Sequence, residues 1–248
     1  MDYVELLVRQ VRQILGDDLL KMPGGVFYSS RDTLKRGQFY MMGHNPGGQQ
    51  NEKETIDKDI HQWINRPLSN WSAYFFSDDQ WNDKGEVPHQ RRVQELGELL
   101  LGTGQGIRDI FSANAIFVRT PASHMLNILP FNSDYRERCW QAHKVFLGIV
   151  KPTLIVCLGN DENVNASSFS LMKKWTCTQD SNVTREDCRN QVYRRARYLK
   201  WFDAKIALGS DEDQSTLFCR IVGVPHPSRF EIVKLEKLGS RLKEVVPG

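Results

Sequence analysis

The sequence lacks a long hydrophobic run: no apolar stretch approaches the roughly 20 residues that a membrane-spanning helix needs. The opening stretch MDYVELLVRQVRQIL mixes charged with apolar residues, so no secretory signal is predicted and a cytoplasmic location is expected. Internal repeats and low-complexity tracts are also missing, which argues against solenoid and disordered classes of protein. With 248 residues, 40% hydrophobic and 25% charged, we expect one globular domain spanning residues 1–248.

Cysteine is scarce. The five cysteines are an odd number and contain no C-x-x-C pair. In a reducing compartment they are expected to be reduced, partly buried thiols. No residues with the spacing of zinc ligands are found, so neither a metal nor another cofactor is expected.

An excess of either charge is missing too, since 33 basic and 30 acidic residues leave a formal charge of +3. That balance alone does not indicate nucleic acid as a partner. One local cluster, YRRARYLK, is basic and is usually read as a solvated surface, becoming a candidate for phosphate contacts only if another feature indicates nucleic acid. Its basic and aromatic members are Tyr193, Arg194, Arg195, Arg197, Tyr198 and Lys200.

Hydrophobic periodicity predicts helices over residues 3–20, 90–101, 133–150 and 230–246, with Ser133 or Asp134 capping the third. Strands are predicted over residues 38–42 and 115–118 and within the runs KPTLIVCLGN and LFCRIVGVPHPS. The uninterrupted apolar run of KPTLIVCLGN is typical of a strand buried on both faces of a parallel sheet. Strands that alternate with helices predict an α/β fold, a three-layer α/β/α sandwich around a four-stranded, mainly parallel sheet.

The stretch QFYMMGHNPGGQQ ends a predicted strand in a loop rich in glycine. Asn-Pro-Gly-Gly by itself is ordinary turn chemistry. However, Asn45 and His226 both follow predicted strands, and ligands bind beyond the carboxyl ends of such strands, so both are expected to face one cleft. Gly43 and Gly47 would let main-chain amides approach a ligand closely. Asn114 adds an amide that donates and accepts hydrogen bonds, as reading the edge of a nucleobase requires.

These segments resemble the uracil-DNA glycosylase superfamily. Its mismatch-specific and single-strand-selective branches carry Gly-x-Asn-Pro-Gly after a strand, here residues 43–47, and the family ends in His-Pro-Ser, here residues 226–228. SANAIFVRTP is similar to the pattern Thr-Asn, apolar run and basic-Pro ending, which places Asn114 at the base-reading position. KPTLIVCLGN is similar to the strand Pro-x-x-Ile-Val-x-x-Leu-Gly. The likeness covers four strand–loop units in order, with unmatched insertions near residues 49–106 and 160–216.

The resemblance implies a monofunctional DNA glycosylase of base excision repair, which flips uracil or a related pyrimidine out of DNA and hydrolyses its N-glycosidic bond. By analogy, Asn45 positions the water and His226 stabilises the leaving base. Asn114 would pair with the Watson–Crick edge, and a main-chain amide at Gly43 or His44 would complete the contact. Because an amide cannot act as a general base, slow turnover is expected.

Further contacts follow from the resemblance. Gly47 replaces a bulky tyrosine that rejects thymine, so thymine or 5-substituted uracils are expected to be accepted as well. One aromatic residue is expected to stack on the base, with Phe76 favoured among Trp71, Tyr74, Phe75 and Phe76. The residues expected to contact DNA are Gly48, Ser228, Arg229 and Phe230. Phe230 either fills the vacated stack or is the first core residue of the last helix.

The branch that shares the Thr-Asn pattern usually has an acidic residue in its first motif and four cysteines for an iron–sulfur cluster. Both are missing here, so no cluster is expected. Two other readings stay open: a non-catalytic nucleic-acid or nucleotide-binding module on the glycosylase fold, and an α/β enzyme acting on free nucleosides. The expected partner is DNA rather than a membrane, and the expected state is a monomer.

Overall fold

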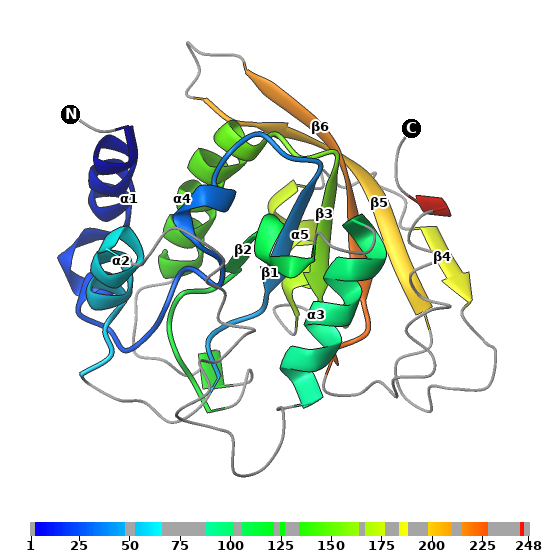
Figure 1. Cartoon of the computed structure of the whole chain (residues 1–248), viewed down its shortest axis with the longest axis horizontal. Coiled ribbons are helices and arrows are strands. Elements are labelled where there is room, and N and C mark those ends of the chain that lie inside the picture. Colours follow the sequence, from blue (N-terminus) through cyan, green and yellow to red (C-terminus); the bar gives the residue numbers. More distant parts are fainter. Residues whose placement is uncertain are drawn as a thin grey trace.

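The structure is a computed structural model that describes residues 3–47, 53–65, 88–101, 106–121, 125–126, 134–163, 167–176, 184–187, 198–209, 215–227 and 244–245 (Figure 1). Its helices are α1 (Tyr3–Leu20), α2 (Ile56–Asn65), α3 (Pro88–Leu101), α4 (Tyr135–Val150) and α5 (Ser168–Thr176), with 3₁₀ turns η1 (Arg31–Thr33) and η2 (Ile107–Asp109). Its strands are β1 (Phe39–Gly43), β2 (Phe111–Asn114), β3 (Leu154–Leu158), β4 (Thr184–Asp187), β5 (Tyr198–Ala207) and β6 (Thr216–Val224).

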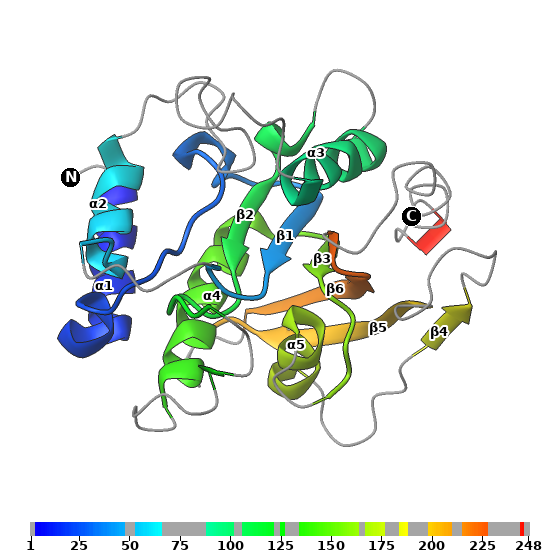
Figure 2. The same cartoon turned by 90° about the horizontal axis from the view of Figure 1, so that it is seen from below.

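Within these described ranges, six strands form one sheet in the order β2-β1-β3-β6-β5-β4 (Figure 2). The first four are parallel, as predicted, and β5 and β4 join antiparallel to them. The predicted number of four strands is therefore wrong. The region predicted to be an insertion, residues 160–216, supplies α5, β4 and β5 to the sheet and its covering layer.

One predicted strand is displaced. The apolar run at residues 115–118 was expected to be a strand, but β2 ends at Asn114. The run is fully buried, yet its main chain follows the loop after β1: Ala115 N donates to Gly43 O and Ile116 N to His44 O. Apart from an isolated bridge between Val118 and Gly24, the run is buried without pairing in the sheet, which explains why an apolar pattern alone placed the strand wrongly.

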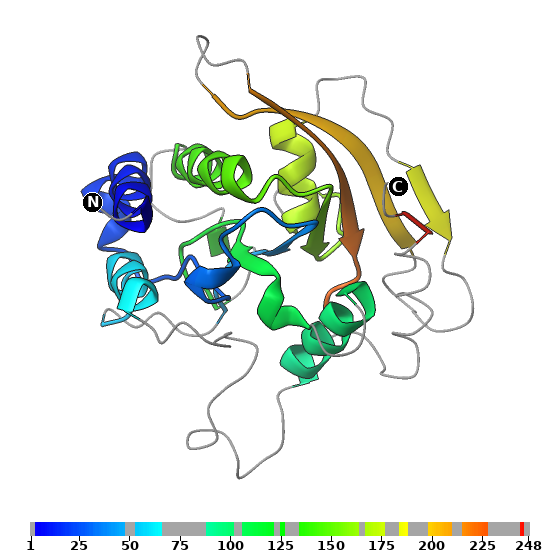
Figure 3. The ribbon, with the colours of Figure 1, turned by 45° about the horizontal axis from the view of Figure 1, so that its top comes forward.

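Two hydrophobic cores, one on each face of the sheet, make the predicted three layers. Buried residues of α1, α2, α4 and α5 pack on one face, and those of α3 and η2 pack on the other. Figure 3 shows α4 and α5 (green and yellow-green) on one side of the sheet and α3 (blue-green) on the other. Along β1 and β3, successive side chains enter alternate cores, because side chains of a strand alternate between its faces.

The predicted helices over residues 3–20, 90–101 and 133–150 are confirmed with small shifts. The first bends at Gly16, whose φ is 72°. The third begins at Tyr135, and Asp134 precedes it without a side-chain capping bond, its carboxylate lying 3.3 Å from Arg138 Nε instead. The predicted tail helix lies outside the described residues apart from positions 244–245. No helix in the described ranges has the length and apolarity needed to cross a bilayer.

Candidate active site

The four parallel strands end together at one edge of the sheet. The register pairs Gly43 with Asn114 and Leu158 with Val224, so the segments that follow these positions leave from that edge. Met41, Leu158 and Val224 belong to the core on the α3 side. Because strand side chains alternate, Asn114 and Gly43 face the same side. Asn45, Asn114 and His226 are thus brought to one edge, where Asn114 ends β2 instead of preceding the strand predicted over residues 115–118.

Asn45 is held by its amide nitrogen. Asn45 Nδ2 donates to Pro46 O at 3.0 Å and to Thr120 Oγ1 at 2.9 Å. A carbonyl oxygen only accepts hydrogen bonds, so the contact with Pro46 O identifies the nitrogen and fixes which way the amide faces. No described residue donates to Asn45 Oδ1. The side chain therefore presents an acceptor from a fixed position.

The segment after β2 braces this loop. Thr120, which is buried, accepts from Asn45 through its hydroxyl and donates its own N–H to Pro46 O at 3.3 Å. Arg119 Nη1 reaches Gly47 O at 3.4 Å, and its Nη2 forms an ion pair with Glu54 at 3.1 Å. Sequence reasoning gave neither side chain a role, although the polar pair directly after the buried run 115–118 marked this segment.

Gly43 is required because another side chain occupies its space. A Cβ at this position would lie 3.0 Å from Asn114 Oδ1 and 3.6 Å from Cε2 of Tyr28. The first distance is shorter than ordinary van der Waals contact, so any larger residue would displace the asparagine. The glycine therefore serves close packing onto Asn114 at the base of the loop.

Asn114 is buried, with 2% of its surface exposed. Its Nδ2 donates to Gly25 O at 3.1 Å, and its main-chain N donates to Val26 O. Asn114 Oδ1 is buried and accepts no hydrogen bond from the described residues. A buried, unsatisfied acceptor costs about 1–3 kcal/mol, so it calls for a ligand or a functional reason.

Tyr28 lies beside this asparagine. Burial raises the pKa of Tyr28, and a hydrogen bond that Asn114 donates to the phenol oxygen lowers it to a smaller extent. The phenol is therefore protonated at neutral pH. Asp59 of α2 holds the adjoining segment, since its Oδ2 accepts from Val26 N at 2.7 Å and from Phe27 N at 3.3 Å. Sequence reasoning missed both residues because they act from segments without a recognisable motif.

His226 follows β6 by two residues and is partly buried. Its ring stacks on that of His89, with 5.1 Å between centroids and 29° between planes. Arg92 Nη1 donates to Pro227 O at 2.6 Å. The first turns of α3 thus hold the loop after β6. Strand β3 separates β1 from β6, so these two strands lie two strand spacings, about 10 Å, apart at the sheet edge.

The remaining predicted residues divide into two groups. Gly47 is exposed, and a Cβ there would meet nothing within 4 Å, which fits the predicted open position. His44 contributes its carbonyl to Ile116 N. Several predicted positions lie outside the described residues: Gly48, Trp71, Tyr74, Phe75, Phe76, Ser228, Arg229 and Phe230.

The basic cluster is represented in the described ranges by its last members. Lys200 Nζ forms an ion pair with Glu162 at 2.7 Å and donates to Asn160 O at 2.9 Å. Only 14% of its side chain is exposed. Lys200 therefore secures the segment after β3, and its charge is already compensated, which weakens it as a phosphate contact.

Among the described residues we find neither a metal-binding group nor a reactive thiol. No group of three or more histidine, cysteine or acidic side chains there could hold a metal ion. Cys139, Cys157 and Cys219 are buried free thiols. Burial raises the pKa of Cys139 and of Cys219 to about 12 each, and that of Cys157 still further, so these thiols are not nucleophiles at neutral pH.

Comparison of the sequence with models of known protein families gives no match, and comparison with curated proteins gives no significant match either. Function is therefore inferred from the motifs and the geometry of the site.

Proposed function

We propose that this protein is a monofunctional DNA glycosylase that hydrolyses the N-glycosidic bond of uracil or a related pyrimidine flipped out of DNA. The observation that carries the proposal is Asn114 Oδ1, a buried acceptor that no described residue satisfies, at the same sheet edge as Asn45 and His226. The resemblance of the four strand–loop units to uracil-DNA glycosylases supports the same conclusion.

Base selection follows from the orientation of Asn114. Its nitrogen is bonded to Gly25 O, so the oxygen is the atom that it offers to a ligand. Uracil and thymine carry a hydrogen on N3 that can donate to this oxygen. Cytosine has a bare N3 that accepts, so the same contact would place two acceptors against each other. Asn114 therefore favours uracil and thymine over cytosine.

The water would be held by Asn45 Oδ1, the acceptor that Thr120 and Pro46 O leave available. Hydrolysis bonds the water oxygen to the sugar carbon and breaks the carbon–nitrogen bond, whose electrons go to the base. One proton of the water passes to solvent, and the released base takes up a proton in its place. An amide orients the water but does not take its proton, so the general-base contribution, about 10²–10⁴-fold, is absent. The enzyme is expected to be slow.

The departing base gains negative charge, which a hydrogen-bond donor at a base oxygen stabilises. We assign this donor to His226 on the loop after β6. Gly47 leaves the space beside the base open, since no atom lies within 4 Å of its would-be Cβ. Thymine and 5-substituted uracils are therefore proposed as additional substrates.

The test is cleavage of labelled oligonucleotides that carry U·G, U·A, T·G or single-stranded uracil, read as alkali-sensitive nicks. Nicking by the wild type that His226→Ala and Asn45→Ala abolish is the expected result. His61→Ala and Asn163→Ala change exposed residues of the same types and are the matched controls. If neither uracil nor another modified base is cleaved at high enzyme concentration, the glycosylase proposal is wrong.

A binding module without catalysis is the second candidate, favoured by one observation: an amide stands where a carboxylate would activate water, at Asn45. It predicts specific binding of modified DNA with no release of base. The third reading is an enzyme that acts on free nucleosides, and the salt dependence of binding distinguishes it from a DNA-binding protein. DNA contacts predict that log Kobs falls with log salt by about 0.9 per neutralised phosphate, whereas a nucleoside site predicts almost no dependence.

A further inference from the structure

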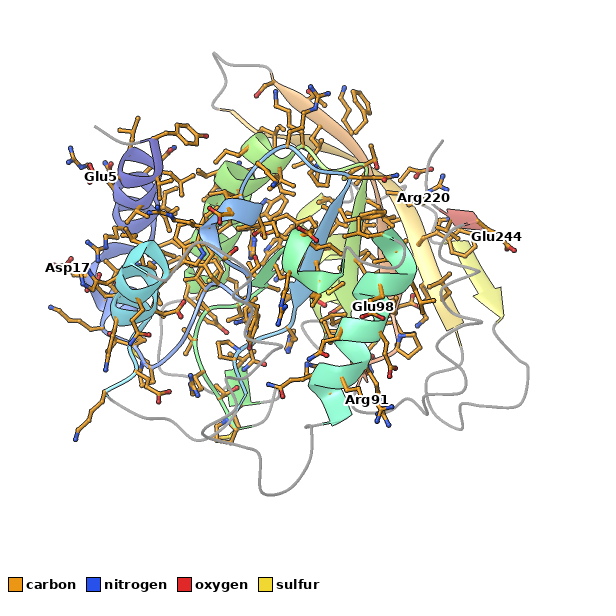
Figure 4. All side chains as sticks on the ribbon, viewed as in Figure 1. Glu5, Asp17, Arg91, Glu98, Arg220 and Glu244 are labelled. Atoms are coloured by element: carbon orange, nitrogen blue, oxygen red, sulfur yellow. The ribbon has the colours of Figure 1, made fainter. Side chains whose placement is uncertain are left out.

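Helix α3 delivers two side chains to the loop after β6. His89, one residue after the start of the helix, stacks on the ring of His226, and Arg92 one turn later donates to Pro227 O at 2.6 Å. Figure 4 shows Arg91 at the end of α3 from which both contacts are made. Helix α3 lies within residues 49–106, which match no family motif, so these contacts belong to this chain and not to the resemblance.

We propose that His89 is a positioning residue for His226, fixing the plane of its ring so that it meets the base oxygen, with Arg92 fixing the main chain of the next residue. The inference rests on the proposed function. A ring that turns freely about its side-chain torsions would sample many directions. A second ring lying against one of its faces, 29° from parallel, restricts the torsion that tilts that plane.

The charge of His89 agrees with this role. Burial, and then the positive charge of Arg92, lower the pKa of His89, so its ring is uncharged at neutral pH. An uncharged ring can stack on a second imidazole without repulsion between cations. The Arg92 contact is charge-assisted and therefore among the stronger hydrogen bonds. Side-chain packing and main-chain anchoring thus act on consecutive residues, His226 and Pro227.

The reason that orientation matters is geometric. A hydrogen bond weakens steeply when its donor angle departs from linearity, and a misplacement of about 1 Å can cost about 100-fold in rate. Substrate binding depends on Asn114 and on DNA contacts elsewhere. Loss of His89 should therefore reduce kcat and leave KM nearly unchanged.

The experiment compares His89→Ala, His89→Phe and Arg92→Met in single-turnover and steady-state cleavage of U·G DNA. We expect kcat of His89→Ala to fall about tenfold, with KM within about twofold. His89→Phe keeps an aromatic face and should recover most of the rate. The kcat of Arg92→Met should fall about as far as that of His89→Ala. Arg91→Met changes an exposed neighbour that pairs with Glu95, and its kcat should match that of the wild type, as should the kcat of His61→Ala.

A second measurement does not depend on activity. A ring stacked on His226 shifts its imidazole proton resonances upfield, and this shift should vanish in His89→Ala and persist in His89→Phe. Circular dichroism and thermal unfolding check that each variant is folded. An active wild type with unchanged kcat in His89→Ala, or unchanged His226 resonances, overturns the inference alone. A wild type that cleaves nothing overturns the proposed function, and the resonances then still decide whether His89 positions His226.

Discussion

Two side-chain amides at the carboxyl edge of the sheet are both anchored through their nitrogen atoms. Asn45 and Asn114 each donate through nitrogen to a main-chain carbonyl, of Pro46 and of Gly25, and each leaves its oxygen without a donor among the described residues. Since a carbonyl oxygen cannot donate, neither amide can flip without losing a hydrogen bond. The site therefore presents two acceptors, which the proposed function assigns to the water and to the N3–H of the base.

At the scale of single residues, Thr120 tests this account of Asn45. Thr120→Val keeps the volume and removes the hydroxyl that accepts from Asn45 Nδ2. We expect the single-turnover cleavage rate to fall about tenfold, because the amide loses one of its two anchors. Thr120→Ser, which keeps the hydroxyl, should retain the rate. An equal loss in both variants would show that packing, and not the hydrogen bond, is what matters.

Helix α3 both packs on the sheet and holds a loop of the candidate site. It covers one face of the sheet through Val93, Leu96 and Leu100, and its first turns hold the loop that carries His226. Its approach to the sheet depends on Gly97. A Cβ at this position would lie 2.5 Å from Ile107 N and 2.8 Å from its Cα, far inside van der Waals contact.

Gly97→Ala should therefore destabilise the protein although alanine is the better helix former. Overpacking against main chain costs about 1–3 kcal/mol, which exceeds the gain of about 1 kcal/mol in helix propensity. Gly148→Ala in α4 is the matched control, because a Cβ there meets nothing within 4 Å and should stabilise. Urea unfolding measures both. The cleavage rate of Gly97→Ala should fall too if α3 positions the loop. Equal unfolding free energies in the two variants would refute the tight contact.

At the scale of the whole molecule, a buried histidine makes the stability of the folded protein depend on pH. His143 of α4 is buried on the face of the sheet that α1, α2, α4 and α5 cover. Its Nδ1 accepts from the Tyr40 hydroxyl at 2.7 Å, and its Nε2 donates to Ala115 O at 3.2 Å. These bonds fit a neutral ring that is protonated on Nε2. Burial lowers its pKa from 6.5 to about 4. Between these values the unfolded chain binds the proton and the native protein does not.

Stability is therefore expected to be complete above pH 6.5 and to decline as the pH falls toward 4. A fall in pKa from 6.5 to about 4 corresponds to a loss of about 3 kcal/mol. The pKa of His89 is also lowered, so this residue makes stability fall in the same direction. The pKa of Asp18 is about 2, so its contribution to stability is lost only below pH 4. Urea unfolding of His143→Gln, which can keep both hydrogen bonds but cannot titrate, should show a shallower slope. An identical slope would assign the pH dependence to other groups.

Local patterns in the sequence were enough to predict the parallel strands, the helices α1, α3 and α4, and the placing of Asn45 and His226 after strands of one sheet, whereas α2 and α5 were not predicted. Each of these predictions depends on periodicity or on the rule that parallel strands end together. Strand β5 could also have been found, since residues 202–206 alternate between buried and exposed. The alternation lies within residues 160–208, a longer stretch of mixed composition in which no strand was predicted.

Tertiary structure alone decided the rest. The run 115–118 is as apolar as a strand, and only its hydrogen-bond partners show that it follows a loop. Gly43 is needed because of Asn114, which is distant in sequence, and Gly97 is needed because the chain folds back on α3 at Ile107. The stacking of His89 on His226 joins residues more than a hundred positions apart. Periodicity reports which face of an element is buried, but which atoms meet there depends on long-range packing.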